Sequence, residues 1–87
     1  MIYEIDIAEK LEKRLEKLPK NDKERILEKI DSLAHNPRPE DCKKLQGNRK
    51  PPLYRVRSGV YRIIYTIRDD VLIVLIVDIG HRKEIYR

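Results

Sequence analysis

The sequence predicts a single α+β domain, in which an N-terminal strand and an antiparallel helical hairpin pack on a mainly antiparallel sheet of about four strands. Two observations support this fold class. Apolar residues recur at three- and four-residue steps as far as residue 34, whereas the period falls to two from residue 53 onward. The 87 residues also provide enough material for one shared core and not for a second domain.

The N-terminal part is predicted to contain one strand and two helices. Apolar residues alternate with acids over 3–7, which indicates a strand. A helix that ends at Pro19 follows, because apolar residues recur at helical spacing: Ala8, Leu11, Leu15 and Leu18. Asn21 and Glu24 have the spacing of an N-cap and its capping-box partner, so they should begin a second helix that ends near Asn36. The short turn between the helices favours an antiparallel hairpin.

The C-terminal part is predicted to form the sheet. After a proline-containing loop, β-branched residues and tyrosines indicate strands at about 53–58, 60–68 and 71–79, with a short further strand near 83–86. The run from Val71 to Val77 has no polar alternation. We therefore expect it to form a central strand covered on both faces.

The expected hairpin register brings three arginines together. A two-residue turn at 58–59 would pair Arg55 with Arg62 and place Arg57 on the same face of the sheet. We call the face carrying Arg55, Arg57 and Arg62 the arginine face. Two arginines directly opposite each other repel, and fold stability gives no reason to choose that pair. An anionic partner is therefore expected on this face.

The end of the last strand is expected to extend the arginine face. A two-residue turn at 69–70 would place Arg62 opposite Val77. Gly80 permits a sharp change of direction at the strand end. Three residues beyond it are then expected near the rim of the face: His81, Arg82 and Tyr86.

The positive charge is unevenly distributed along the chain. Residues 1–47 contain eleven Lys or Arg and eleven acids, whereas residues 48–87 contain nine Lys or Arg and four acids. The whole excess of +5 therefore lies in the strand-rich part, where arginine outnumbers lysine. Arginine offers a planar fork that matches phosphate oxygens in pairs, whereas Lys and Glu at helical spacing are typical of a solvated helix face.

Several classes of function are disfavoured by the composition. One cysteine, Cys42, cannot form an internal disulfide and indicates a reducing, cytoplasmic compartment. No set of His, Cys, Asp or Glu has the spacing of a metal site, and no glycine-rich phosphate loop is visible, so no cofactor is expected. The longest apolar run has seven residues, which is too short to cross a membrane.

The chain contains three motifs that occur together: K-L-x-G over 44–47, Y-R-x-R-x-G-x-Y-R-x-x-Y over 54–65 and G-H-R-x-E-x-Y over 80–86. This combination resembles the RelE/ParE superfamily of bacterial and archaeal toxins, on the RelE side. The resemblance implies a RelE-like microbial ribonuclease-type fold and a toxin that cuts mRNA in the ribosomal A site by 2′-hydroxyl attack. It also implies a cognate antitoxin that holds the toxin inactive, with operator DNA bound only through that antitoxin.

The resemblance assigns a role to each arginine of the arginine face. Arg55 and Arg57 match basic positions, often lysines, that bind the RNA backbone and help activate the 2′-hydroxyl. Arg62 matches a residue that stabilises the scissile phosphate. Arginine is always protonated near neutral pH and is a poor general base.

The resemblance also assigns roles near the C-terminus. Arg82 matches a residue near the 5′-oxygen leaving group, and Tyr86 matches a tyrosine that orients a base. His81 is a candidate acid or base, because it is the nearby group that titrates close to neutral pH.

Alternatives stay open for the function and for the basic residues of the first helix. A ParE-like toxin that inhibits gyrase, or a degenerate member that only binds its antitoxin, would use the same fold without catalysis. Tyr54, Tyr61 and Tyr65 alternate away from the arginine face and are interpreted as packing residues. The basic residues of the first helix are interpreted as solvated surface, with contact to ribosomal RNA as the alternative: Lys10, Lys13, Arg14 and Lys17.

Overall fold

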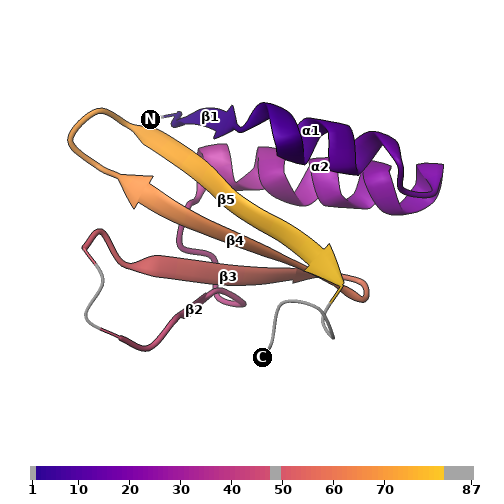
Figure 1. The fold of residues 1–87 in the computed structure, drawn as a ribbon. Coiled ribbons are helices and arrows are strands. Elements are labelled where there is room, and N and C mark those ends of the chain that lie inside the picture. The colour runs from indigo at the N-terminus through magenta and orange to yellow at the C-terminus, as the bar shows by residue number, and fades with distance from the viewer. Residues whose placement is uncertain (1, 48–49, 82–87) are drawn as a thin grey trace.

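The structure is a computed structural model and describes residues 2–47 and 50–81. In chain order the elements are β1 (Glu4–Ile7), α1 (Glu9–Glu16), α2 (Lys20–His35), β2 (Lys43–Lys44), β3 (Leu53–Ser58), β4 (Tyr61–Arg68) and β5 (Ile73–His81) (Figure 1). The α+β class and the helical hairpin are confirmed. The sheet has five strands where about four were expected, because β2 is too short to produce a periodic pattern. The strand expected near 83–86 lies outside the described residues.

The sheet has the strand order β1-β5-β4-β3-β2. β1 runs parallel to β5, and the other neighbours are antiparallel. The central strand is therefore β4, which is buried without a break from Arg62 to Ile67. The prediction that Val71–Val77 is the central, doubly covered strand is wrong. β1 pairs only with 73–76 of that segment, and Val71 and Val77 are 53% and 37% exposed.

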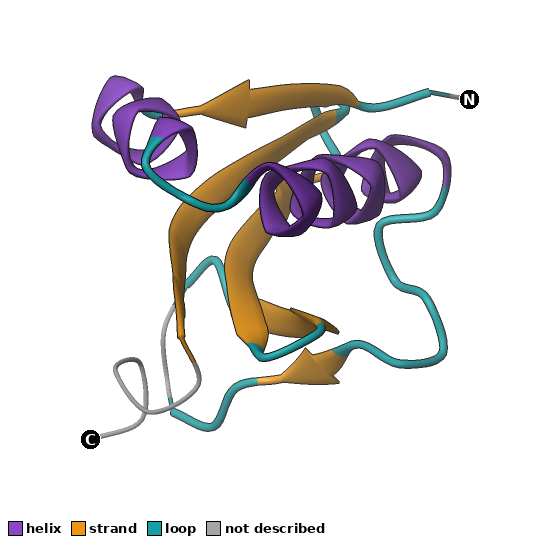
Figure 2. Ribbon diagram, turned by 90° about the vertical axis from the view of Figure 1, so that its right-hand side faces the viewer, coloured by secondary structure: helices purple, strands orange, loops and turns teal. Residues whose placement is uncertain are grey.

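The core lies between the two helices and the face of the sheet that they cover (Figure 2). From the helices it takes Leu11, Leu15, Ile26, Ile30 and Leu33. From the sheet it takes residues of β3, β4 and β5: Val56, Ile63, Tyr65, Ile67, Val74, Ile76 and Ile79. Burying one such side chain stabilises the fold by roughly 1.5–3 kcal/mol. Tyr54 and Tyr61 pack against this cluster, so the interpretation of the three tyrosines as packing residues is confirmed.

The second helix begins two residues earlier than expected. Pro19 occupies the cap position with a φ of −53°, and its carbonyl oxygen accepts a hydrogen bond from the N–H of Lys23 at 3.0 Å. No side chain caps this end. The predicted N-cap at Asn21 is therefore wrong, because Asn21 lies inside α2 and Pro19, with a ψ of 144° outside the helical range, is the cap residue.

The β3–β4 hairpin turns at Gly59 and Val60, one residue later than expected. Gly59 has a φ of +61°, a conformation that glycine adopts without strain. Ser58 then pairs with Tyr61, and Arg57 stands directly opposite Arg62. The predicted pairing of Arg55 with Arg62 is wrong by two residues.

The β4–β5 connection is also longer than the predicted two-residue turn. It takes residues 69–72, with Leu72 at a φ of +56°. The register of the β4–β5 pair also shifts between Ile64 and Tyr65. As a result Arg62 stands opposite Gly80 instead of Val77.

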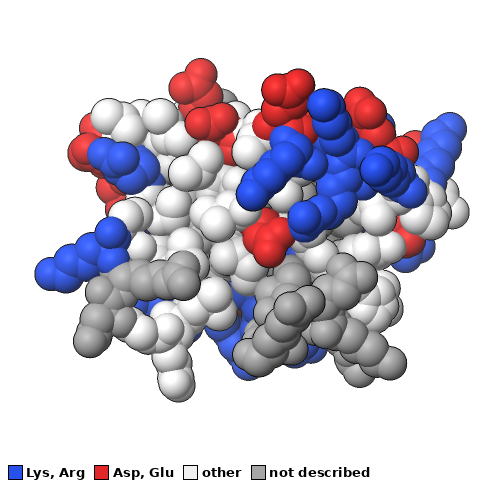
Figure 3. All heavy atoms as spheres, viewed as in Figure 1, with Lys and Arg blue, Asp and Glu red and all other residues white. Residues whose placement is uncertain are grey.

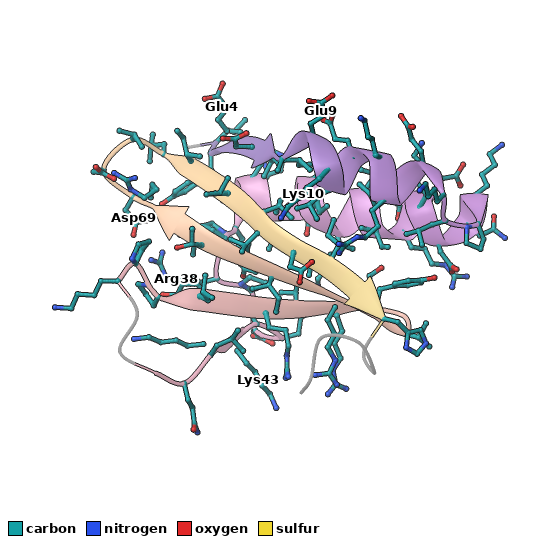
Figure 4. All side chains as sticks on the ribbon, in the orientation of Figure 1. Glu4, Glu9, Lys10, Arg38, Lys43 and Asp69 are labelled. Carbon is teal, nitrogen blue, oxygen red and sulfur yellow. The ribbon has the colours of Figure 1, made fainter. Side chains whose placement is uncertain are left out.

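A polar cluster joins three distant segments at one end of the sheet (Figure 4). Arg38 donates to both carboxylate oxygens of Asp69, at 3.3 and 2.8 Å, and the Tyr3 hydroxyl donates to the same carboxylate at 2.6 Å. These hydrogen bonds, from Arg38 first and then from Tyr3, lower the pKa of Asp69. The guanidinium of Arg38 also lies 5.6 Å from the centre of the Tyr54 ring.

Candidate functional site

The arginine face exists in the structure, on the side of the sheet away from the core. Arg55 and Arg57 alternate with the buried Val56 along β3, and Arg62 precedes the buried Ile63 on β4. Cross-strand partners point to the same face, so the Arg57–Arg62 pair fixes the three guanidinium-bearing side chains on one side. The two-residue error in register left this result unchanged, because side chains alternate with a period of two.

The three arginines differ in exposure. Arg57 is exposed, Arg55 is half-buried and Arg62 is 9% exposed on the central strand. Gly80 of β5, which is itself buried, stands directly opposite Arg62. Arg62 therefore occupies a packed, central position, while Arg57 faces solvent beside it.

A fourth cation, Lys43, was missed in the sequence. It lies on β2 directly opposite Arg55 and is exposed (Figure 4). A two-residue strand has no periodicity, and the adjacent K-L-x-G motif was the one available signal that the chain returns to the sheet here. The face now contains two like-charge pairs directly across strands, Lys43–Arg55 and Arg57–Arg62. Each such pair destabilises a sheet by about 0.2–1 kcal/mol.

An acid close to these cations is already engaged. Asp78 stands opposite Ile64, and its carboxylate accepts a hydrogen bond from Arg14 of α1 at 2.7 Å. Arg14 also donates to the carbonyl oxygen of Ile79 at 2.6 Å. Asp78 therefore offers little neutralisation to the arginine face.

His81 does not lie where the sequence reasoning expected it. β5 continues straight through Gly80, and His81 pairs with Tyr61. The two rings meet edge to face, with centroids 6.0 Å apart and an interplanar angle of 76°. Since Tyr61 packs against the core cluster, the His81 ring is on the helix side of the sheet. The expected change of direction at Gly80 is wrong, because both Gly80 and His81 belong to β5. Arg82 and Tyr86 lie outside the described residues.

A cavity of about 340 Å³ lies next to His81. It is lined by α1 and by the ends of β4 and β5, including Arg14, Lys17, Tyr61 and His81. The cavity is therefore on the helix side, separated from the arginine face by the sheet itself.

Over residues 2–47 and 50–81, no group of three or more His, Cys, Asp or Glu is arranged to hold a metal ion. No helix in the described part of the chain is long and apolar enough to cross a membrane.

Comparison with known proteins identifies the family. A family model described as the ParE toxin of the type II toxin–antitoxin system parDE matches residues 5–86. A protein of Escherichia coli strain K12 named mRNA interferase toxin RelE is 31% identical over 90 residues, covering 99% of this chain and 92% of its own length. The chain belongs to the RelE/ParE superfamily of toxins.

Solved structures of RelE proteins share the fold as well. The archaeal RelE–RelB complex of Pyrococcus horikoshii matches with a TM-score of 0.82 and 34% identity, covering 94% of this chain and 97% of the matched one. The RelB–RelE antitoxin–toxin complex of Methanococcus jannaschii matches with a TM-score of 0.70 and 27% identity, covering 93% and 94%. The expected resemblance and the RelE-like fold are thus confirmed.

Proposed function

We propose that this protein is a RelE-type toxin: an endoribonuclease that cuts mRNA in the ribosomal A site and inhibits translation. The observation that carries the proposal is the gathering of four cations on one face by the cross-strand pairs Lys43–Arg55 and Arg57–Arg62, an arrangement that suits a polyanion. The name of the E. coli relative, an mRNA interferase toxin, supports the same substrate.

The proposed reaction uses the substrate's own nucleophile. The RNA 2′-hydroxyl attacks the adjacent phosphorus, the bond to the 5′-oxygen breaks, and the products are a cyclic phosphate and a 5′-hydroxyl. Negative charge develops on the phosphorane oxygens, where fixed cations stabilise it. Arg62, held in the packed centre of the sheet, suits the scissile phosphate, and Arg55 and Arg57 suit the flanking backbone. In this scheme no metal is required, and the ribosome supplies the alignment of the codon.

The proton transfers remain assigned by resemblance. His81 is proposed as acid or base, although its ring lies against Tyr61 on the helix side, so a contribution requires that it reach the substrate around the end of β5. Arg82 is proposed to act near the leaving 5′-oxygen, and Tyr86 to orient a base.

The proposed partners are a cognate antitoxin, the ribosome and mRNA. Two matched structures are RelE bound to RelB, which supports an antitoxin for this chain. We propose that the antitoxin neutralises the arginine face in the cytoplasm and that operator DNA is bound through the antitoxin alone.

Primer extension on an mRNA in a translating extract tests the nuclease. Wild-type protein should give codon-phased cuts that disappear with Arg62→Ala. Arg68→Ala is the matched control, because Arg68 is an exposed arginine at the far end of the same strand, paired with Asp70 at 3.3 Å. Cuts that persist in Arg62→Ala, or vanish equally in both variants, contradict the assignment of Arg62. Purified mRNA incubated without ribosomes tests the ribosome requirement.

A ParE-like action is the second candidate, because the matching family model carries the ParE description. It predicts stalled DNA supercoiling by gyrase while mRNA stays intact in the same extract. That result would contradict the nuclease proposal.

A further inference from the structure

An acid, Asp78, belongs to the arginine face by its register. Asp78 pairs with Ile64, which lies two residues from Arg62 and therefore on the same side of β4. Gly80 stands opposite Arg62, so Asp78 is the diagonal neighbour of Arg62. Diagonal neighbours in an antiparallel pair lie about 7–8 Å apart, a separation that long side chains span. A carboxylate at this position is therefore within reach of the Arg62 guanidinium.

The carboxylate of Asp78 is instead bound at the outer edge of β5. Arg14 Nη1 donates to Asp78 Oδ1 at 2.7 Å, and the same oxygen accepts the N–H of Ile79 at 2.9 Å. Arg14 also donates to the carbonyl oxygen of Ile79 at 2.6 Å. Because Arg14 belongs to α1, on the helix side of the sheet, the acid meets it around the edge of the strand. We call Arg14, Asp78 and Ile79 the edge brace.

Two features of β5 make the edge brace possible. β1 pairs only with residues 73–76, so in the described part of the chain β5 has no strand on its outer side from Val77 onward. The register shift between Ile64 and Tyr65 makes Val77 an extra, exposed residue directly before Asp78. A β-bulge of this kind bends the strand and re-aims nearby side chains. The open edge and the bulge together let the carboxylate leave the arginine face.

The edge brace lies at the surface of the molecule. In the space-filling view Lys and Arg side chains gather over α1, and an acidic group lies directly against them (Figure 3). The side chains of Arg14 and Asp78 are 49% and 45% exposed. Ion pairs at that exposure contribute little to the stability of a fold, so stability alone does not explain why the acid is held there.

We infer that Arg14 is a positioning residue, which holds the carboxylate of Asp78 at the strand edge and so keeps the charge of Arg62 available to the RNA phosphate. Once released from Arg14, the carboxylate of Asp78 pairs with Arg62 across the strands. Carboxylate and phosphate oxygens bind the guanidinium fork in the same bidentate geometry, so the acid competes with the substrate. The inference deepens the proposed function and rests on it for the choice of RNA as the anion.

The test compares loss with rescue. Arg14→Ala removes the hold on Asp78, and Asp78→Asn removes the competing charge while its side-chain oxygen still accepts from Ile79. The decisive protein is the double variant Arg14→Ala/Asp78→Asn. Its matched control is Arg14→Ala/Glu12→Gln, which restores the same net charge through an exposed acid of α1 and leaves Asp78 in place.

Two measurements are made on each protein. Primer extension in a translating extract gives the rate of mRNA cleavage. Fluorescence anisotropy of a short, labelled, 2′-O-methylated, single-stranded RNA gives the affinity, because this RNA lacks the nucleophile and stays intact. Circular dichroism checks that each variant is folded at the assay temperature. Arg14→Gln, which keeps more of the side chain, replaces Arg14→Ala if the alanine variant is unfolded.

We expect Arg14→Ala to lower the cleavage rate and the affinity about 10-fold, within the range of roughly 2- to 150-fold over which residues in contact are coupled. The double variant should return to within about threefold of wild type, whereas the control should stay as weak as Arg14→Ala. Asp78→Asn alone should cleave at least as fast as wild type, since no carboxylate remains to compete. Arg14→Lys should keep most of the activity, because an ammonium also binds the carboxylate.

Unchanged activity and affinity in Arg14→Ala overturn the inference, because the edge brace would then only protect the strand edge from pairing. A double variant that stays as weak as Arg14→Ala also contradicts it, since Arg14 would then act on RNA or on the ribosome directly. Equal recovery in the control refutes it too, because net charge alone would explain the effect. A wild-type protein that never cuts mRNA, in a series that shows the expected pattern of affinities, refutes the proposed nuclease and leaves this inference intact.

Discussion

Replacing Arg57 by glutamine should make the protein more stable and less active. Arg57 is exposed on β3 and stands directly opposite Arg62, which is 9% exposed. Glutamine keeps most of the length and polarity of the side chain and removes its charge. The substitution therefore isolates the electrostatic repulsion between the two cations.

The expected gain in stability follows from the direct cross-strand pairing of Arg57 with Arg62. Like charges directly opposite each other on antiparallel strands cost about 0.2–1 kcal/mol, so a gain of about 0.5 kcal/mol is expected. For a domain of this size that corresponds to a rise in Tm of about 2–4 °C. The gain should shrink in 1 M salt, where the Debye length falls to about 3 Å.

Urea and thermal unfolding at two salt concentrations measure the stability, and primer extension in a translating extract measures the activity. Arg68→Gln is the control for stability, since Arg68 stands opposite Ile73 and its charge meets that of Asp70 instead of another arginine. Removing it should give no gain. An Arg57→Gln protein that is less stable than wild type, or equally active, refutes the reasoning that the pair is kept for an anion.

Three other substitutions test the fold. Leu33→Ala empties a fully buried position between α2 and the sheet and should lower the free energy of unfolding by about 2–5 kcal/mol in urea titrations; a loss below 1 kcal/mol would contradict the packing described. Tyr65→Phe removes the buried hydroxyl that donates to the Pro37 carbonyl oxygen at 2.7 Å and should cost about 1–3 kcal/mol in the same assay, whereas an unchanged midpoint would show that the bond contributes nothing. Asp69→Asn should make the free energy of unfolding fall less steeply as the pH is lowered. Because the pKa of Asp69 is lowered in the folded protein, its carboxylate stabilises the fold above the unfolded pKa of about 3.9, and this contribution is lost as pH falls through the folded pKa. The stabilities of wild type and variant should therefore converge at low pH, and parallel pH profiles would contradict the role given to Arg38 and Tyr3.

The side of the sheet on which a residue lies was easier to predict than its partner on the neighbouring strand. The alternation of Arg55 and Arg57 with Val56 places them on one side of β3 whatever the exact pairing, so the arginine face survived a two-residue error. The pairing itself depended on backbone angles at Gly59 and Leu72, which composition does not specify. The turn between β3 and β4 lies one residue later than predicted, at 59–60, and the connection between β4 and β5 is two residues longer, at 69–72. Each difference changed the cross-strand partner of Arg62.

Other parts of the site depended on contacts that leave no pattern in the sequence. Lys43 joins the face through a two-residue strand, and its position depends on the course of the whole loop from His35 to Leu53. The position of His81 depended on whether Gly80 bends the chain or continues the strand. Glycine permits both, and the pairing of His81 with Tyr61 decides for the strand.

The parallel pairing of β1 with β5 has a consequence for synthesis. Glu4 pairs with Ile73 and Ile7 with Ile76, so β1 has no partner strand until β5 has been synthesised. Contacts so distant in sequence form late in folding. On a nascent chain the helical hairpin has its own local contacts, but the sheet edge stays open and Arg62 has no Gly80 beside it. A protein proposed to attack translating ribosomes therefore completes its sheet only after its own ribosome has made β5.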